Sequence, residues 1–506
     1  MKRLHLADLI LDTCLLSESE IAKIATNIIS FLECEHFTAS DPELVAFLKN
    51  QVDCLSSAAL LSHSRSIAHI LKNDLYDTLE AATQRLPELV PSLRGDVHPS
   101  RPRRASIIAS RYEKLFIARR NLPSDENGGF VQRLDNLQVR LLEAAYRIAR
   151  KSPRAGGLDD QWFPSLLACA ASMRNDALQE LGAGNSDPSD QTTLLANYAK
   201  RRGLANKLHH AISFSELTGL IDAIVENVFP GTALQWSAAS TPDHLVICAI
   251  HIGKREAGHV YITMPNVGAG VPSFTVPLAS RSNMLGVSQK PFALVQCSLP
   301  RGSRQIGLQR ALAFAHEMGH AVQHIGSKET DPSFSGIDSI SAGYEEVVSY
   351  LFEKEFMQAW SIGIDRPDSD ARRALISIKK IEFSLNFEQE VALSYLDYLL
   401  LGDSEGSVQQ AVSRLNHVSG RDRHVSELLA RISPSMLRSY LGRVYRYPVG
   451  HAISALWISA LRDYNLARTQ KFSRSALEMW RGSGYLNSSI TARQAATHLQ
   501  DFYTLF

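Results

Sequence analysis

Apolar and polar residues alternate with a spacing of three and four positions over most of the 506-residue chain, and this period is typical of amphipathic α-helices. The pattern predicts helices before residue 230 and again after residue 340. The predicted helices cover residues 18–33, 42–61, 64–86, 135–150, 306–325, 345–360, 370–385, 387–401, 407–416, 424–431, 436–464 and 492–502. The sequence therefore predicts a mainly α protein.

Short β-branched and aromatic runs replace this pattern between residues 245 and 300. Residues 245–250 and 259–262 are two such runs with a Gly-containing connection between them, which predicts a hairpin. Residues 273–277 and 292–297 predict two further strands. We expect a small, mostly antiparallel β-sheet directly before the helix at 306–325, with an edge strand that can bind an extended peptide through main-chain hydrogen bonds.

Two regions follow from these patterns, an N-terminal helical region at 1–230 and a second region at 231–506. The second contains the predicted sheet at 245–300, the helix at 306–325 and C-terminal helices at 340–503. A hydrophobic content of 45% in a chain of this length is enough for a large core.

Charge and cysteine usage narrow the function classes. The 53 Lys and Arg residues nearly balance the 52 Asp and Glu residues, so the chain has no general attraction to nucleic acid or to an anionic membrane. No apolar run approaches the roughly 18 residues of a membrane span, and Asp8 and Asp12 interrupt the apolar stretch in which a signal peptide would have its core. The six cysteines include no Cys-x-x-Cys pair, which is typical of reduced thiols. We expect a cytoplasmic protein, monomeric and without a nucleic-acid partner.

The helix predicted at 306–325 contains His316, Glu317 and His320 with the spacing H-E-x-x-H. Residues four apart lie on the same face of a helix, so the two imidazoles can aim at one point. Glu317 can reach a water held at that point but is angled away from direct ligation. The spacing predicts the zinc site of a metalloprotease. The alternative is an amphipathic helix whose two histidines face solvent.

A zinc site with two histidines needs a third protein ligand. The helix predicted at 345–360 carries Glu346 and Glu353, which are seven residues apart and share a face. A carboxylate from a separate helix can complete a His₂Glu site that leaves the fourth position to water. Glu345 is interpreted instead as an exposed carboxylate, which is favourable at a helix start.

From about residue 250 to residue 457 the sequence resembles the thimet oligopeptidase and oligoendopeptidase F family of zinc peptidases, peptidase family M3. The resemblance is clearest in four segments. They are the Gly-Lys-Arg hairpin at 251–258, the F-A-H-E-M-G-H-A helix at 314–321, the E-V-V-S-x-x-x-E segment at 346–353 and the tyrosine-rich segment at 440–450.

The resemblance implies that His316, His320 and Glu346 bind one Zn²⁺ per chain, with Glu317 as the general base. It also implies a zincin-type fold, in which a small antiparallel sheet lies beside the metal helix and two helical halves surround a deep channel. Short unfolded peptides would enter this channel and folded proteins would not. The predicted activity is that of a zinc-dependent metalloendopeptidase, an oligopeptidase that hydrolyses short unstructured peptides.

In this family, two tyrosines that match Tyr440 and Tyr447 contact the substrate or the developing oxyanion. The family usually has a histidine shortly before them, whereas residues 433–439 contain none, and His424 and His451 are the candidates to replace it.

A different function class stays open, namely a non-catalytic zinc-containing interaction module or an inactive peptidase relic. A structural zinc is normally closed by a fourth protein ligand, usually Cys, and no Cys lies near this motif in the sequence. A structural site also has no use for a carboxylate at Glu317. Both points favour catalysis.

Overall fold

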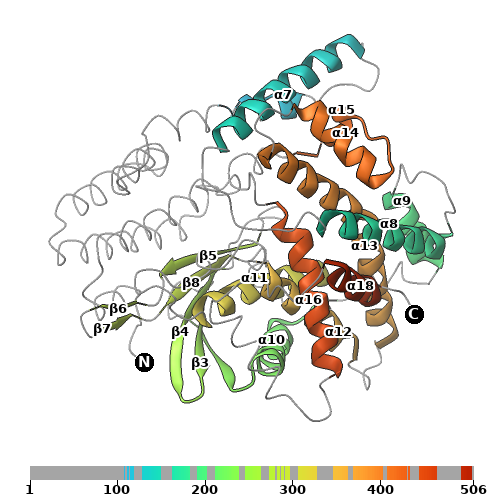
Figure 1. The fold of residues 1–506 in the computed structure, drawn as a ribbon. Helices are drawn as coiled ribbons and strands as arrows, with labels where there is room; N and C mark the ends of the chain where they lie inside the picture. Colours follow the sequence, from blue (N-terminus) through green and yellow to red (C-terminus); the bar gives the residue numbers. More distant parts are fainter. Residues whose placement is uncertain are drawn as a thin grey trace.

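The structure, a computed structural model, describes residues 108, 111–112, 114–118, 128–149, 162–182, 191–201, 211–238, 245–263, 273–279, 282–284, 287–289, 291–296, 306–326, 346–362, 369–402, 407–429, 431–432, 444–463 and 492–503. The helices predicted at 18–33, 42–61 and 64–86 lie outside these residues. The longer described elements are helices, so the prediction of a mainly helical protein with a small sheet is confirmed (Figure 1).

The labelled helices, in chain order, are α7 (Gly128–Ala149), α8 (Trp162–Leu181), α9 (Gln191–Arg201), α10 (Phe214–Val228), α11 (Leu308–Gly326), α12 (Val347–Ile362), α13 (Ser369–Gly402), α14 (Val408–Ser419), α15 (Val425–Leu429), α16 (Arg446–Asp463) and α18 (Ala492–Tyr503). The strands are β1 (Ala211–Ile212), β2 (Thr232–Ala238), β3 (Leu245–Ile252), β4 (Arg255–Thr263), β5 (Phe274–Ala279), β6 (Ser282–Met284), β7 (Val287–Gln289), β8 (Phe292–Gln296) and β9 (Ile306–Gly307).

Five strands form one mixed sheet in the order β2-β3-β4-β8-β5 (Figure 1). The predicted hairpin is β3–β4, and the strands predicted at 273–277 and 292–297 are β5 and β8. β8 lies between β4 and β5, which both precede it in the chain, and it pairs parallel with β4 and antiparallel with β5. β2 extends the sheet beyond the predicted 245–300. Its large apolar side chains are limited to Leu234 and Trp236, so its strand pattern is weak.

Helix α11 lies against β4, β8 and β5 and places its residues beside the sheet edge formed by β5 (Figure 1). Gly258 in β4 lies in this tightly packed region, where a Cβ would lie 2.2 Å from the main-chain oxygen of Pro291 and 2.8 Å from the Cγ2 atom of Ile325 on α11. The helix begins at Leu308, two residues later than predicted, because Ile306 and Gly307 pair with β1 as the short strand β9.

Two glycines allow α11, α12 and α16 to approach one another closely. A Cβ on Gly319 of α11 would lie 2.6 Å from the Cα atom of Ser349 on α12. A Cβ on Gly450 of α16 would lie 2.7 Å from the Cβ atom of Glu346, the residue that precedes α12. The three helices therefore meet around Glu346 at distances that a larger residue at either glycine would not permit.

α13 is one helix of 34 residues, whereas the sequence pattern predicted two, at 370–385 and 387–401. The predicted break falls at Asn386, a residue that is common at helix ends. Asn386 is exposed, and its side-chain amide donates to the carbonyl of Glu382 one turn earlier at 2.9 Å. The helix therefore continues through it.

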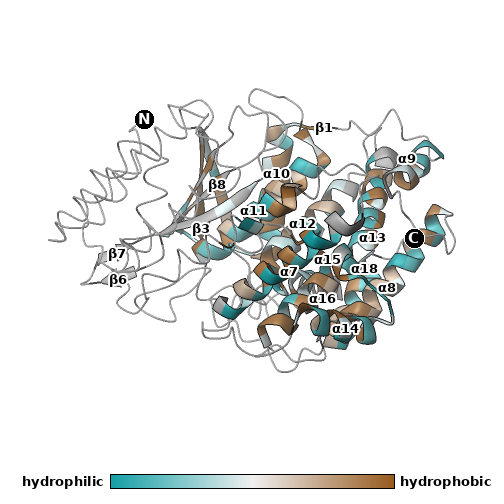
Figure 2. Cartoon of the chain, turned by 90° about the horizontal axis from the view of Figure 1, so that it is seen from above, coloured by the Kyte–Doolittle hydropathy of each residue, from teal (hydrophilic) through white to brown (hydrophobic). Residues whose placement is uncertain are grey.

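The helices pack into one hydrophobic cluster that includes residues of α7, α8 and α10 as well as α11 to α16 and α18. α13 and α18 both pack against α8, and α16 packs against α12 and α18. Figure 2 shows apolar and polar residues on different faces of these helices. None of the described helices combines the length and the apolar character needed to cross a lipid bilayer. Cys169 and Cys248 are buried free thiols, and the other cysteines lie outside the described residues.

Candidate metal centre

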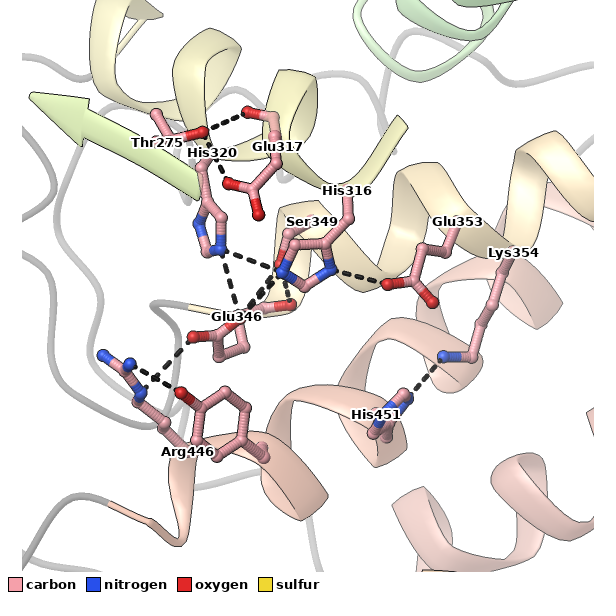
Figure 3. Close-up of polar contacts among 11 residues, drawn as sticks. Thr275, His316, Glu317, His320, Glu346, Ser349, Glu353, Lys354, Arg446 and His451 are labelled. Atoms are coloured by element: carbon pink, nitrogen blue, oxygen red, sulfur yellow. Dashed lines mark hydrogen bonds and ion pairs between the residues drawn. The ribbon is translucent and has the colours of Figure 1, made fainter. Parts of the chain in front are cut away.

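His316, His320 and Glu346 bring three donor atoms together where α11 meets the start of α12 (Figure 3). The Nε2 atoms of the two histidines are 3.1 Å apart. The Oε2 atom of Glu346 lies 3.4 Å from Nε2 of His316 and 3.2 Å from Nε2 of His320. The histidine side chains are 16% and 13% exposed, so one side of the cluster reaches solvent.

These separations fit a metal ion. Zinc holds nitrogen and carboxylate oxygen at about 2.0–2.2 Å in a tetrahedron, which places neighbouring ligand atoms roughly 3.3–3.5 Å apart. The three observed distances lie at or just below this range. Two imidazoles and one carboxylate are also the donor set of a zinc site with an open fourth position. Among the described residues, no other group of three metal-ligating side chains gathers in this way.

The carboxylate of Glu346 is almost completely buried and has a partner for each oxygen. Its Oε2 atom faces the two histidines and also accepts a 3.3 Å hydrogen bond from Ser349, while Oε1 lies 3.3 Å from Nε of Arg446. Burial alone would raise the pKa of this carboxyl. The two histidines and Arg446 outweigh burial and hold the pKa of Glu346 well below its ordinary range. Glu346 is therefore an anion that can bind a cation without first losing a proton.

Glu353 supports His316 from the side opposite the donor cluster. Its Oε1 atom lies 2.6 Å from Nδ1 of His316. Burial disfavours the charged imidazole, but the contacts with Glu346 and Glu353 raise the pKa of His316 well above its ordinary value. Because Nδ1 faces the carboxylate of Glu353, a cation that binds at the cluster would take the place of a proton on Nε2. The sequence placed Glu353 on the same face as Glu346 but did not indicate this role.

Replacement of Glu353 should weaken metal binding without abolishing it. We expect Glu353→Ala to lower zinc affinity about 10- to 100-fold, because the ring of His316 loses the acceptor that fixes its orientation. Glu353→Gln, whose amide oxygen can still accept from Nδ1, should lose less. Titration of zinc against a chromophoric chelator measures both. Equal affinity in the wild type and Glu353→Ala would contradict the role assigned to this carboxylate.

Glu317 points toward the edge strand β5. Its side chain is buried, and its Oε2 atom accepts a 2.7 Å hydrogen bond from the hydroxyl of Thr275, which also lies 2.9 Å from the main-chain oxygen of Glu317 (Figure 3). The carboxylate is thus adjacent to the donor cluster but outside it. Sequence analysis did not find Thr275, because 42 residues separate it from Glu317 and nothing in the local pattern of β5 singles out its hydroxyl.

The other predicted residues have different positions. Tyr447 lies in the first turn of α16, where its hydroxyl accepts a 2.9 Å hydrogen bond from Arg446. Tyr440 lies outside the described residues. His451 is buried and stacks on the ring of Tyr350, with centroids 3.4 Å apart, and His424 is exposed just before α15. Of the two predicted tyrosines, Tyr447 is the one that the structure describes, and Arg446 contacts both its hydroxyl and the carboxylate of Glu346.

A second group of buried polar side chains lies behind Tyr350, whose ring meets that of His316 edge-on. Lys354 on α12 is fully buried, with Nζ 2.9 Å from Oγ of Ser454 and 3.3 Å from Nδ1 of His451. Burial lowers the pKa of Lys354 from 10.5 to about 7, although the charges of Glu353 and Glu390 oppose this shift. The neutral and the charged amine of Lys354 are therefore both populated near neutral pH.

The buried lysine should make stability depend on pH. Between pH 7 and 10.5 the unfolded chain holds a proton on Lys354 that the folded chain has lost, so the contribution of Lys354 to the free energy of unfolding rises with pH by up to about 1.4 kcal/mol per pH unit. Lys354→Met removes this contribution. We expect the gain in unfolding free energy of Lys354→Met over the wild type to be largest below pH 7 and to decline toward pH 10.5.

Urea unfolding at a series of pH values measures this difference, and Lys200→Met, a change at an exposed lysine of α9, is the matched control. A stability difference between Lys354→Met and wild type that stays constant from pH 6 to 10 would show that Lys354 keeps its proton in the folded protein.

Comparison with known proteins adds little to this site. No family model matches the chain, and no curated protein matches its sequence. Several solved structures align over nearly the whole chain. Three of them are a protein named BsuCP (11% identity, 98% of each chain, TM-score 0.43), a carboxypeptidase from Pyrococcus furiosus (13%, 99% of each chain, 0.42) and an M32 carboxypeptidase from Deinococcus radiodurans R1 (14%, 99% of this chain and 98% of that one, 0.49). Similarities at this level assign neither a family nor an activity.

Proposed function

We propose that this protein is a zinc-dependent peptidase that hydrolyses short, unstructured peptides. The observation that supports this most is the triangle of His316 Nε2, His320 Nε2 and Glu346 Oε2, with sides of 3.1–3.4 Å and with Glu317 beside it. Zinc bound by these three residues would acidify a water molecule and polarise the carbonyl of the scissile bond. The cluster is partly exposed, which suits a site that exchanges water and substrate.

The remaining steps belong to residues of the chain. Glu317 takes a proton from the attacking water as its oxygen bonds to the carbonyl carbon, and later transfers that proton to the nitrogen of the leaving amine as the C–N bond breaks. A phenol such as Tyr447 can donate a hydrogen bond to the oxygen that becomes negative, without adding a charge. Strand β5, at the edge of the sheet and in contact with Glu317 through Thr275, supplies main-chain groups along which an extended peptide can pair.

The alternative is a structural zinc in an interaction module or an inactive relic. A structural site is normally closed by a fourth protein ligand. The described residues gather three donors at this cluster, and Glu317 lies next to it with its carboxylate held by Thr275. These observations favour the catalytic function.

The test is digestion of a mixed library of short peptides by the zinc-loaded protein, with the products identified by mass spectrometry. We propose internal cleavage, because pairing along an edge strand requires no free terminus on the substrate. Stepwise loss of single residues from one end would make the protein an exopeptidase instead. The same digestion with Glu317→Gln controls for contaminating proteases, and an inactive wild type that holds a full equivalent of zinc would contradict the proposal.

A further inference from the structure

Arg446 occupies a position between the candidate metal ligand and the candidate oxyanion donor. It is the first residue of α16, and its side chain is 14% exposed. Its Nε atom lies 3.3 Å from Oε1 of Glu346, and one terminal nitrogen donates to the hydroxyl of Tyr447 at 2.9 Å. The guanidinium carbon also lies 4.8 Å from the centre of the Tyr447 ring (Figure 3). One planar group therefore contacts two residues that the proposed reaction uses.

Because of the contact with Arg446, the two carboxylate oxygens of Glu346 have different partners. Oε2 faces the histidines, and Oε1 faces Arg446. An oxygen engaged by a guanidinium is less available to a metal, so this arrangement favours ligation through one oxygen and leaves room for a fourth ligand. The close packing of Gly450 on the Cβ atom of Glu346 fixes the start of α16 against this carboxylate.

The contact with Tyr447 fixes how the phenol can act. Arginine has donors but no acceptor, so Arg446 uses a lone pair of the phenol oxygen and not its proton. A hydrogen bond from a cation also polarises the O–H bond of the phenol and makes it a stronger donor. The guanidinium thus holds the oxygen of Tyr447 in place through a hydrogen bond that does not use the phenol proton.

We infer that Arg446 is a positioning residue that keeps Glu346 in single-oxygen ligation and orients the phenol of Tyr447 as a hydrogen-bond donor. The second half of this inference rests on the proposed function. A lysine at this position would supply one compact charge in place of a fork of separate donors, so it can satisfy Glu346 but cannot hold both partners in fixed geometry. The variants Arg446→Lys and Arg446→Met therefore separate the two tasks.

Zinc affinity tests the contact with Glu346, by competition with a chromophoric chelator in the absence of peptide. Arg446→Met should bind zinc about 10- to 100-fold more weakly than the wild type, and Arg446→Lys should remain close to the wild type. Arg140→Met, which changes an exposed arginine on α7, is the matched control and should have no effect. Circular dichroism establishes that each variant is folded. Wild-type zinc affinity in a folded Arg446→Met would overturn this half of the inference.

A double-mutant cycle tests the contact with Tyr447. Tyr447→Phe should lower kcat about 10²- to 10³-fold with KM little changed, and Arg446→Lys should lower kcat at least about tenfold. In the Tyr447→Phe background, Arg446→Lys should lower kcat no further, because its effect on turnover passes through the phenol. Independent, multiplicative losses in the double variant would show that Arg446 does not act through Tyr447.

A failure of the proposed peptidase function can be told apart from a failure of the inference about Arg446. If zinc-loaded wild type cleaves no peptide, the proposed function is wrong, and the zinc affinities still decide whether Arg446 holds Glu346. The contact with Tyr447 is then decided by the unfolding free energies of the same four proteins. Non-additive changes would support the contact, and additive changes would overturn it.

Discussion

Glu317→Gln should abolish most peptide hydrolysis while it leaves the metal site intact. The amide keeps the shape of the carboxylate and its oxygen can still accept from the hydroxyl of Thr275, so the local packing should persist. An amide cannot take the proton of the attacking water, however, and loss of a general base costs about 10²- to 10⁴-fold in rate. Zinc content and melting temperature should stay near those of the wild type.

Elemental analysis and kcat/KM measured on one preparation decide this prediction. Glu427→Gln, the same change at an exposed position on α15, should leave both quantities unchanged. Loss of zinc from Glu317→Gln would make this residue a ligand, and retained activity would remove it from the mechanism.

Glu346→Ala should lose zinc, and with it all activity. Only two protein donors would remain, and two histidines hold zinc poorly. The change also leaves Arg446 without the anion that its Nε atom faces. We therefore expect a larger loss of affinity than the about 10- to 100-fold predicted for Glu353→Ala, whose side chain supports a ligand without being one. His316→Ala and His320→Ala should behave like Glu346→Ala.

Equilibrium dialysis with measurement of bound zinc tests this prediction. Glu345→Ala is a useful control, because it removes the same kind of side chain one residue before the assigned ligand. Glu345 lies outside the described residues. If Glu345→Ala lost zinc and Glu346→Ala kept it, the assignment of the third ligand would be off by one residue.

The parts of the site that the sequence predicts are those that depend on local periodicity. Two histidines four apart must share a helix face, and a His₂ site needs a carboxylate from a second helix. The family resemblance then singled out Glu346 among the carboxylates there. Thr275 and Arg446 are different. Each reaches the site from a segment far away in the chain, so their roles follow from how β5 and α16 pack and not from their neighbours in sequence.

The same distinction applies to the fold. The period of the apolar positions identified most of the described helices, and the β-branched runs identified β3, β4, β5 and β8. The sequence pattern could not show that β8 lies between β4 and β5, because strand order is decided by tertiary pairing. The pattern also predicted a break at Asn386, where the exposed side chain instead bonds back to the helix and α13 continues.

The strand order implies a sequence of events during folding. β5 precedes β8 in the chain but joins the sheet only by pairing with β8, so its place in the sheet is complete only once β8 has also paired with β4. The metal ligands sit on α11 and at the start of α12, which contact each other directly. A refolding chain can therefore gather its three metal ligands while Glu317 still lacks the strand that holds its carboxylate. Zinc uptake would then precede the recovery of turnover.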